Sequence, residues 1–269
     1  ASYAKMKFNE RVEIRLFKYI EKLQEALETS IPDVIGFANY AWNRQISKEM
    51  SKIFLEKNPN GVVVWGGPNF PADVESQELF FKKFPEVDIY VPIEGEIGFS
   101  NIIKEIFTLP SFDLMRKNIL TKSVPGCIVK SLDGKLNFEF SVDRIKSLDE
   151  IPSPYLTGIL DEFFDGRLVP MIQTNRGCPF SCTFCADGLA IKNKVHRYDL
   201  QRTKDELEEY KNSDPIEIVR LEILKKKLAT DSELEKISKE IIEEVKAAAD
   251  FALKSKFPSS EELYTDVYI

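Results

Sequence analysis

Short apolar runs and helical patterns alternate along the first part of the chain. They follow one another as apolar run 33–38, helical segment 46–57, run 61–67, helical segment 74–84, run 87–91 and helical segment 98–108. Strands of parallel sheets are apolar throughout because helices cover both faces. The pattern predicts β-α-β units around a parallel sheet, preceded by a helix over about 11–28.

The next part of the chain shows a hairpin signal. Residues 126–130 and 136–140 are strand candidates, and the turn-favouring pair Asp133-Gly134 lies between them. We expect this hairpin to be a connector between domains. A further strand candidate is Leu168 to Ile172, after the proline-rich stretch at 151–155.

Beyond Gly188 the chain has no glycine, which indicates a change to long helices. Helical patterns cover about 201–212, 215–228 and 231–255. In the last of these, apolar residues at three-and-four spacing form one stripe, and Thr230 with Glu233 fits a capping box at its start.

Composition narrows the class of protein. The chain has 269 residues, of which 43% are hydrophobic and 30% charged, the balance of a chain that folds around a core. A net charge of −7 argues against a nucleic-acid or anionic-membrane partner. No apolar stretch approaches the roughly 20 residues of a membrane span, and there is no signal-peptide pattern, so we expect a cytoplasmic protein.

Three of the four cysteines lie within eight positions. Cys178, Cys182 and Cys185 have the spacing C-x3-C-x2-C, directly after a predicted strand. Thiolates suit iron-sulfur clusters, zinc and copper(I). A four-iron cluster held by three cysteines keeps one iron open for an exogenous ligand. The alternative is a structural zinc site completed by Cys127 or His196; otherwise Cys127 is a small buried hydrophobe and His196 a structural histidine.

This motif resembles the signature of the radical S-adenosylmethionine (radical SAM) superfamily, C-x3-C-x-aromatic-C, with Phe184 as the aromatic residue. The resemblance implies a [4Fe-4S] cluster on the three cysteines, with S-adenosylmethionine on the fourth iron and Phe184 beside its adenine. It also implies reductive formation of a 5'-deoxyadenosyl radical, an electron donor such as flavodoxin or ferredoxin, and a small-molecule or peptide substrate. Arg176 would offset the charge of the cluster or form a surface salt bridge.

Residues from about Asp33 to Phe107 resemble the N-terminal cobalamin-binding domain found in some radical SAM proteins. Family similarity places the loops with Gly66-Gly67 and Glu94-Gly95-Glu96 near a corrinoid, and this gives four candidate cofactor-binding residues: Gly66, Gly67, Glu94 and Glu96. The alternatives are a tight turn for the glycines and a solvated loop for the glutamates. The chain lacks the D-x-H-x-x-G motif that ligates cobalt, which argues against corrinoid binding.

Residues 202–269 resemble the C-terminal tail of the α subunit (E1 α) of thiamine-diphosphate-dependent 2-oxo acid dehydrogenases. Matching blocks are Arg202–Tyr210, Ser213–Ile216 and the helix over 233–254. The resemblance implies packing against partner chains, including a dehydrogenase β subunit, and carries over no thiamine residue.

The predicted fold class is α/β: a truncated Rossmann-like parallel sheet, the start of a radical SAM (β/α) barrel, and a helical tail. We expect an N-terminally truncated cobalamin-binding-like domain over 1–115, a connector with the hairpin over 116–160, the cluster segment over 161–200 and the tail over 201–269. Only 84 residues follow Cys185, fewer than a barrel of about six units of roughly 30 residues requires, so we expect a catalytically incomplete fusion or fragment. The alternatives are an assembly fragment of a dehydrogenase α subunit and a zinc-stapled structural protein.

Overall fold

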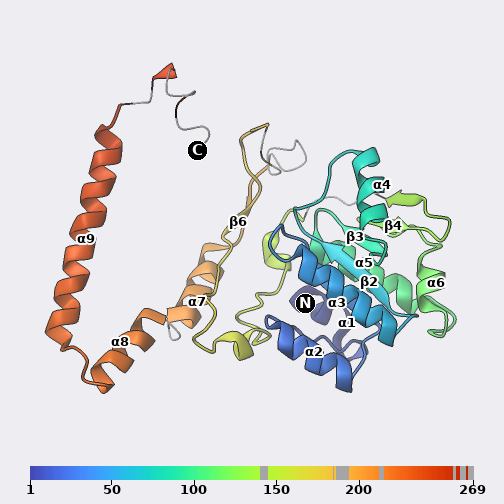
Figure 1. The fold of residues 1–269 in the computed structure, drawn as a ribbon, viewed down its shortest axis with the longest axis horizontal. Coiled ribbons are helices and arrows are strands. Elements are labelled where there is room, and N and C mark those ends of the chain that lie inside the picture. Colours follow the sequence, from blue (N-terminus) through green and yellow to red (C-terminus); the bar gives the residue numbers. More distant parts are fainter. Residues whose placement is uncertain are drawn as a thin grey trace. The chain divides into compact units, whose positions relative to one another are not determined.

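The structure is a computed structural model, and it describes residues 1–139, 145–183, 185, 194–211, 215–256, 259–260 and 265. The chain divides into two compact units, Ala1–Tyr210 and Lys211–Ile269 (Figure 1).

A five-stranded sheet forms the centre of the first unit, in the order β1-β2-β3-β4-β5. Its strands are β1 (Val34–Ala38), β2 (Val62–Gly66), β3 (Ile89–Val91), β4 (Cys127–Lys130) and β5 (Leu136–Glu139). The first three run parallel, with Val34 opposite Val62 and Val64 opposite Ile89, and β4 and β5 are antiparallel. The predicted α/β fold with parallel strands is confirmed.

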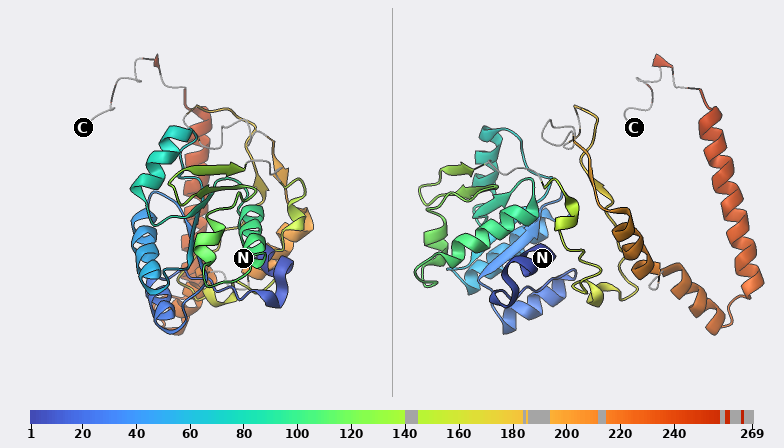
Figure 2. Two further views of the ribbon diagram at one scale, coloured as in Figure 1. Left: turned by 90° about the vertical axis from the view of Figure 1, so that its right-hand side faces the viewer. Right: turned by 180° about the vertical axis from the view of Figure 1, so that it is seen from behind.

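Helices cover both faces of this sheet. On one face lie α2 (Ile20–Thr29), α3 (Arg44–Lys57) and α4 (Val74–Lys83); on the other lie α5 (Gly95–Phe107) and α6 (Met115–Ile119). The left view of Figure 2 shows the blue and cyan helices on one side of the sheet and the green helices on the other. Because side chains alternate along a strand, neighbouring residues of β2 belong to opposite cores: Val63 packs with the first set and Val64 with the second.

Trp65 is the largest fully buried side chain, and it anchors the first core. Its ring lies 5.3 Å from that of Phe84 and 6.1 Å from that of Phe80, and its indole N–H donates to Ser51 Oγ at 3.1 Å. A buried tryptophan whose N–H has a partner combines a large apolar area with a satisfied donor. These contacts of Trp65 fix the position of β2 relative to α3 and α4.

The N-terminal segment differs in part from the predicted helix over 11–28. The structure has α1 (Ser2–Phe8), a short 3-10 turn (Asn9–Arg11) and an extended stretch before α2 begins at Ile20. From residue 11 to residue 16, exposed and half-buried positions alternate, which is the two-residue period of an extended chain. Apolar residues at 12, 14 and 16 fit this period as well as a helical one, so that part of the helix prediction was wrong.

The hairpin of β4 and β5 continues the sheet. Ile128 pairs with Tyr90 of β3 and Val129 with Ile89, and both β4 residues are fully buried. By pairing with β3, strand β4 gives hydrogen-bond partners to the backbone groups on that side of β3. A connector that did not join the sheet would leave these groups unpaired. The sheet therefore crosses the boundary that we expected near residue 115.

The strand predicted at Leu168 to Ile172 is not formed. Val169 and Met171 are strongly exposed, and Pro170 between them has no N–H to donate. An apolar run becomes a strand only where a neighbouring strand pairs with it. The described residues of 161–183 contribute one short strand, β6 (Asn175–Arg176), which pairs antiparallel with β7 (His196–Arg197).

The tail is helical, as predicted. It contains α7 (Leu200–Lys211), α8 (Pro215–Lys225) and α9 (Asp231–Lys254). The capping box is confirmed: Thr230 Oγ1 accepts from the Glu233 N–H, and the Glu233 carboxylate accepts from the Thr230 N–H at 2.7 Å. Within the described ranges, no helix combines the length and apolar character needed to cross a membrane.

Candidate functional site

The cysteine segment begins at the short ladder of β6 and β7. Arg176 pairs with His196 in this ladder, and the Tyr198 N–H donates to the Thr174 carbonyl at 3.1 Å. The ladder therefore brings the two ends of the segment from 177 to 195 together. Gly177 leaves β6 with φ of 100°, a conformation that favours glycine, and the cysteines follow directly.

The three cysteines are open to solvent to different degrees. Cys182 and Cys185 are exposed and Cys178 is half-buried. The Cys185 N–H donates to the Cys182 carbonyl at 3.2 Å, which makes a turn between these two residues. The predicted adenine neighbour, Phe184, lies outside the described residues.

The donor set has the chemistry of an iron-sulfur site, but its side chains are not gathered. Among the described residues, no group of three His, Cys, Asp or Glu side chains is placed to hold a metal. Binding of a metal can draw its ligands together, because a preformed site rarely exists in an unfolded chain and metal binding is coupled to folding. Three thiols on one exposed segment with a fixed base are compatible with such convergence.

The two residues that would complete a zinc site lie in other settings. Cys127 is fully buried in β4, with its thiol 3.5 Å from the Gly98 carbonyl oxygen. Burial, with a smaller contribution from the charge of Glu139, raises the pKa of Cys127 to about 12. A thiol that keeps its proton is a poor metal ligand, which supports its interpretation as a buried hydrophobe. His196 has its Nδ1 3.0 Å from the Lys146 carbonyl oxygen.

Arg176 joins the cysteine segment to the sheet domain. Its Nη2 lies 2.7 Å from Glu96 Oε1, and its Nη1 lies 3.0 Å from Glu96 Oε2 and 3.3 Å from Glu94 Oε2. The arginine and Glu96 side chains are each 21% exposed, and that of Glu94 is 5% exposed. A two-pronged arginine-carboxylate pair fixes orientation as well as distance.

The charges of this cluster stabilise one another. Burial raises the pKa of Glu96, but the hydrogen bonds and charge of Arg176 outweigh burial, so the pKa of Glu96 lies below its ordinary value. Burial lowers the pKa of Arg176, and the two glutamates more than reverse this effect. Arg176 is therefore held in an ion pair with the sheet domain. The sequence singled out all three residues, but the eighty positions between Glu96 and Arg176 concealed their pairing.

Glu94 and Glu96 lie at the start of α5, in the loop after β3. Glu94 is the N-cap residue of α5, and Gly95 and Glu96 form its first turn. Carboxylates at this end of a helix interact favourably with its dipole. A pocket of about 200 Å³ borders Glu96 and is lined also by Tyr3 and Phe99.

The glycine pair at the end of β2, Gly66 and Gly67, has a structural role. Gly67 has φ of 113°, and a Cβ there would lie 3.1 Å from the Asn39 carbonyl oxygen; a Cβ on Gly66 would lie 3.2 Å from the Val91 carbonyl oxygen. The Tyr90 hydroxyl donates to the Gly67 carbonyl at 2.9 Å. The tight-turn interpretation of this pair is therefore supported, and the close approach is to the protein's own backbone.

The loop after β1 carries an aromatic pair that the sequence analysis did not single out. Trp42 is 79% exposed, and its ring stacks on that of Tyr40 with centroids 4.6 Å apart. This loop and the loops after β2 and β3 follow the carboxyl ends of parallel strands, where ligands of such sheets bind. A tryptophan shortly after a predicted strand is the sequence signal that could have identified this aromatic pair.

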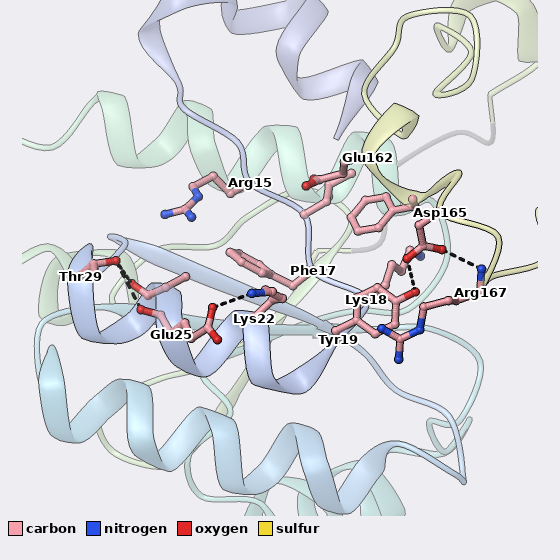
Figure 3. A pocket seen from close by; sticks show the side chains of 13 residues that line it. Arg15, Phe17, Lys18, Tyr19, Lys22, Glu25, Thr29, Glu162, Asp165 and Arg167 are labelled. Carbon is pink, nitrogen blue, oxygen red and sulfur yellow. Dashed lines mark hydrogen bonds and ion pairs between the residues drawn. The ribbon is translucent and has the colours of Figure 1, made fainter.

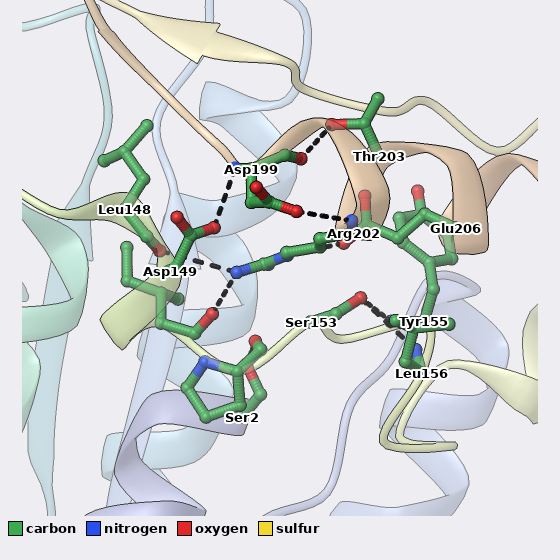
Figure 4. Close-up of polar contacts among 12 residues, drawn as sticks. Ser2, Leu148, Asp149, Ser153, Tyr155, Leu156, Asp199, Arg202, Thr203 and Glu206 are labelled. Atoms are coloured by element: carbon green, nitrogen blue, oxygen red, sulfur yellow. Dashed lines mark hydrogen bonds and ion pairs between the residues drawn. The ribbon is translucent and has the colours of Figure 1, made fainter.

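The start of α7 is fastened to the segment 145–155. Arg202 donates to the carbonyls of Leu148 and Ile151 and pairs with Glu206 at 3.0 Å, and the Asp199 N–H donates to Asp149 at 2.9 Å (Figure 4). Glu206 is 5% exposed. The first residues of the dehydrogenase-like segment thus pack into the first unit.

A separate, larger pocket of about 540 Å³ lies between the extended segment before α2 and residues 162–167 (Figure 3). The Tyr19 hydroxyl donates to Asp165 at 2.7 Å, and the Arg167 guanidinium lies 4.6 Å from the centre of the Tyr19 ring. The hydrogen bond from Tyr19 lowers the pKa of Asp165. None of the residues lining this pocket belongs to the cysteine segment or to the loops after β1, β2 and β3.

Comparison with known proteins supports both resemblances, although no family model matches the chain. Homologues over the larger part of the chain are cobalamin-dependent radical SAM methyltransferases. TokK of Streptomyces tokunonensis is 30% identical over 196 residues, and the 2-(S-pantetheinyl)-carbapenam-3-carboxylate methyltransferase of Streptantibioticus cattleyicolor is 30% identical over 194. Each match covers 68% of this chain and 26% of the relative. The chain thus spans about a quarter of the length of these relatives.

A solved structure shows the same fold. The apo form of the cobalamin-dependent S-adenosylmethionine radical enzyme OxsB matches with a TM-score of 0.52 and 20% identity, over 72% of this chain and 25% of that one. The C-terminal part of the chain matches a different protein. The pyruvate dehydrogenase E1 component subunit alpha of Rickettsia felis is 45% identical over 67 residues, 25% of this chain and 21% of the relative.

Proposed function

We propose that the first unit is the N-terminal part of a radical SAM enzyme. In this proposal Cys178, Cys182 and Cys185 hold a [4Fe-4S] cluster, and S-adenosylmethionine binds the fourth iron. The observation that carries it is the segment with three thiols, held at its base by the β6-β7 ladder, in a chain whose homologues are radical SAM methyltransferases. An electron donor of the flavodoxin or ferredoxin class would supply the reducing electron.

A cluster on these thiols would supply the single electron for reductive cleavage of S-adenosylmethionine, and so the radical chemistry that removes a hydrogen atom from a substrate. The three thiols lose their protons on binding, because thiolates are the ligating form. Phe184 is proposed to lie beside the adenine. Arg176 pairs with Glu96 at 2.7 Å. This pair would hold the base of the cysteine segment beside the carboxyl ends of the parallel strands, where ligands of such sheets bind.

Relatives of this chain are named as cobalamin-dependent enzymes, so cobalamin is a second candidate cofactor. The residues of the sheet domain restrict the ways in which it could bind to this chain. The only histidine of the chain, His196, is in β7, so no imidazole of the sheet domain is available to ligate cobalt. A corrinoid held through histidine therefore does not fit. The exposed pair Tyr40 and Trp42 offers an aromatic surface in the loop after β1, where we propose that a corrinoid without a histidine ligand would lie.

Anaerobic reconstitution followed by iron and sulfide analysis tests the cluster. We expect about four iron and four sulfide per chain, with loss of most of the iron in the Cys182→Ala variant. The matched control is Cys127→Ala, which removes a buried thiol outside the segment and should keep the full iron load. A Cys182→Ala variant with unchanged iron, or a protein with one zinc and no chromophore, would contradict the proposal.

The second unit favours an additional role in assembly with other chains. The 45% identity of the C-terminal part of the chain to a pyruvate dehydrogenase α subunit over 67 residues is the specific observation. Under this second candidate, the tail packs against another chain, and a dehydrogenase β subunit is one test partner. Co-purification of an iron-free protein with that subunit would favour it over the radical SAM proposal.

A further inference from the structure

The described residues of the second unit form no core of their own. None of its described residues is buried, and α9 exposes Ile237, Ile241 and Val245 by 54%, 53% and 62%. Most of the stability of a helix in a protein comes from packing an apolar face rather than from intrinsic propensity. A 24-residue helix with a bare apolar face therefore calls for a surface that covers it.

Part of the apolar surface of α9 forms a narrow stripe, and the exposed Ile242, Phe251 and Leu253 lie outside it. Its members share three-and-four spacing, and at 100° per residue they fall within an arc of about 80°: Leu234, Ile237, Ile241, Val245, Ala248 and Ala252. The helix is about 36 Å long at 1.5 Å per residue. We call these six residues the α9 stripe. Its length and narrowness match the contact face of another helix.

Side-chain size changes along the α9 stripe. The amino-terminal half has Leu234, Ile237 and Ile241, whereas the carboxyl-terminal half has one valine and two alanines. An antiparallel copy would place Leu234 opposite Ala252 and Ile241 opposite Val245. Large residues would then face small ones along the whole contact, which keeps the helix spacing constant. A parallel copy would crowd one end and leave a gap at the other.

Charge changes along α9 in the same direction. Within α9, residues 231–243 contain five acidic and two basic residues, and residues 244–254 contain two acidic and two basic residues. Antiparallel pairing brings the acidic half of one helix beside the neutral half of the other, and parallel pairing brings the two acidic halves together. Exposed charge pairs each contribute less than about 1 kcal/mol, so they select the orientation while apolar burial supplies the affinity.

From these two gradients we infer that α9 packs antiparallel against α9 of a second copy of this chain. A face of about 36 by 10 Å on each copy is smaller than the faces that stable interfaces bury, so the dimer is weak and its population depends on concentration. The inference concerns the second unit alone. It does not depend on the cluster, and the two proposals are tested by different measurements.

Sedimentation velocity of the 269-residue chain tests the inference. We expect the dimer fraction to rise between about 1 and 100 µM, as mass action requires. The Ile241→Glu variant puts a charge at the centre of the pairing and should weaken the dimer at least tenfold. Ala247→Glu is the matched control, because it adds the same charge on the polar face of α9 and should sediment like the parent chain.

The relative orientation of the two α9 helices is tested by cross-linking. A photoreactive benzoylphenylalanine at position 238, beside the α9 stripe, should give cross-linked dimers joined to the region around 248. Cross-links between the two 238 regions would show parallel pairing and overturn the inference. A monomer at 100 µM would also overturn it. In that case, protection of α9 amides from hydrogen exchange would mean that the chain's own first unit covers the stripe, and full exchange would leave a different protein as its partner.

Discussion

The guanidinium of Arg176 grips the Glu96 carboxylate with two hydrogen bonds, at 2.7 and 3.0 Å. Arg176 comes two positions before Cys178, and Glu96 is in the first turn of α5, directly after β3. This pair is a direct electrostatic link between the cysteine segment and the sheet domain, and it fixes one end of that segment.

Neutralising Glu96 should therefore loosen the cysteine segment. We expect Glu96→Gln to lower the free energy of unfolding at pH 7 by about 2 kcal/mol, because Arg176 loses its charged partner in a partly buried site. The matched control is Glu78→Gln on the exposed side of α4, which should change stability by less than about 0.5 kcal/mol. Urea denaturation of both variants and the parent measures this difference.

The same pair predicts a pH dependence. The pKa of Glu96 in the folded chain lies below its ordinary value of 4.5, since Arg176 favours the carboxylate. The stability that this provides is present above the unfolded-state pKa and is lost as the pH falls through the folded-state pKa. The stability difference between the parent and Glu96→Gln should thus shrink as the pH falls below about 4.5. A difference that stays constant at acidic pH would argue against the ion pair.

Gly67 and Gly95 should respond in opposite ways to alanine. At Gly67 the positive φ and the Asn39 backbone 3.1 Å away leave no room for a Cβ, and we expect a loss of about 2 kcal/mol. At Gly95 nothing lies within 4 Å, and alanine in the first turn of α5 should be neutral or stabilising by up to about 1 kcal/mol. Thermal denaturation of the two variants provides the comparison, and equal losses would contradict the tight turn.

Arg202 should hold α7 to the segment 145–155 of the first unit. Its removal leaves the Glu206 carboxylate, which is 5% exposed, without its cation and deprives the Leu148 and Ile151 carbonyls of a donor. We expect Arg202→Ala to cost about 3 kcal/mol and to make α7 sensitive to limited proteolysis. Arg220→Ala removes an exposed ion pair with Asp231 in the second unit and serves as the control. Cleavage within α7 at the parent's rate would contradict the role of Arg202.

The sheet and the long helices could be predicted because local pattern determines them. The run Val62 to Trp65 is apolar at every position, as a strand covered on both faces must be, and the stripe and cap of α9 follow helical spacing. The segments at 11–19 and 168–172 were misjudged because their apolar residues also fit other periods, and the presence or absence of packing partners decides between them.

The sequence predicted which residues form the candidate site better than it predicted which of them contact one another. The spacing of Cys178, Cys182 and Cys185 identified the segment. The roles of Glu94, Glu96 and Gly67 depend on residues distant in sequence that fold beside them, and a single sequence does not reveal such pairs. Glu96 was chosen as a cofactor neighbour, and in the structure its carboxylate faces Arg176.

The central claim is that three thiolates leave one iron free for S-adenosylmethionine. Its most direct measurement is electron paramagnetic resonance of the reduced, reconstituted protein before and after addition of S-adenosylmethionine, with the Cys127→Ala variant as control. We predict a [4Fe-4S]⁺ signal in both proteins that shifts when the cosubstrate binds. A signal unchanged by saturating S-adenosylmethionine, or no cluster signal from a protein that retains all three cysteines, would contradict the account.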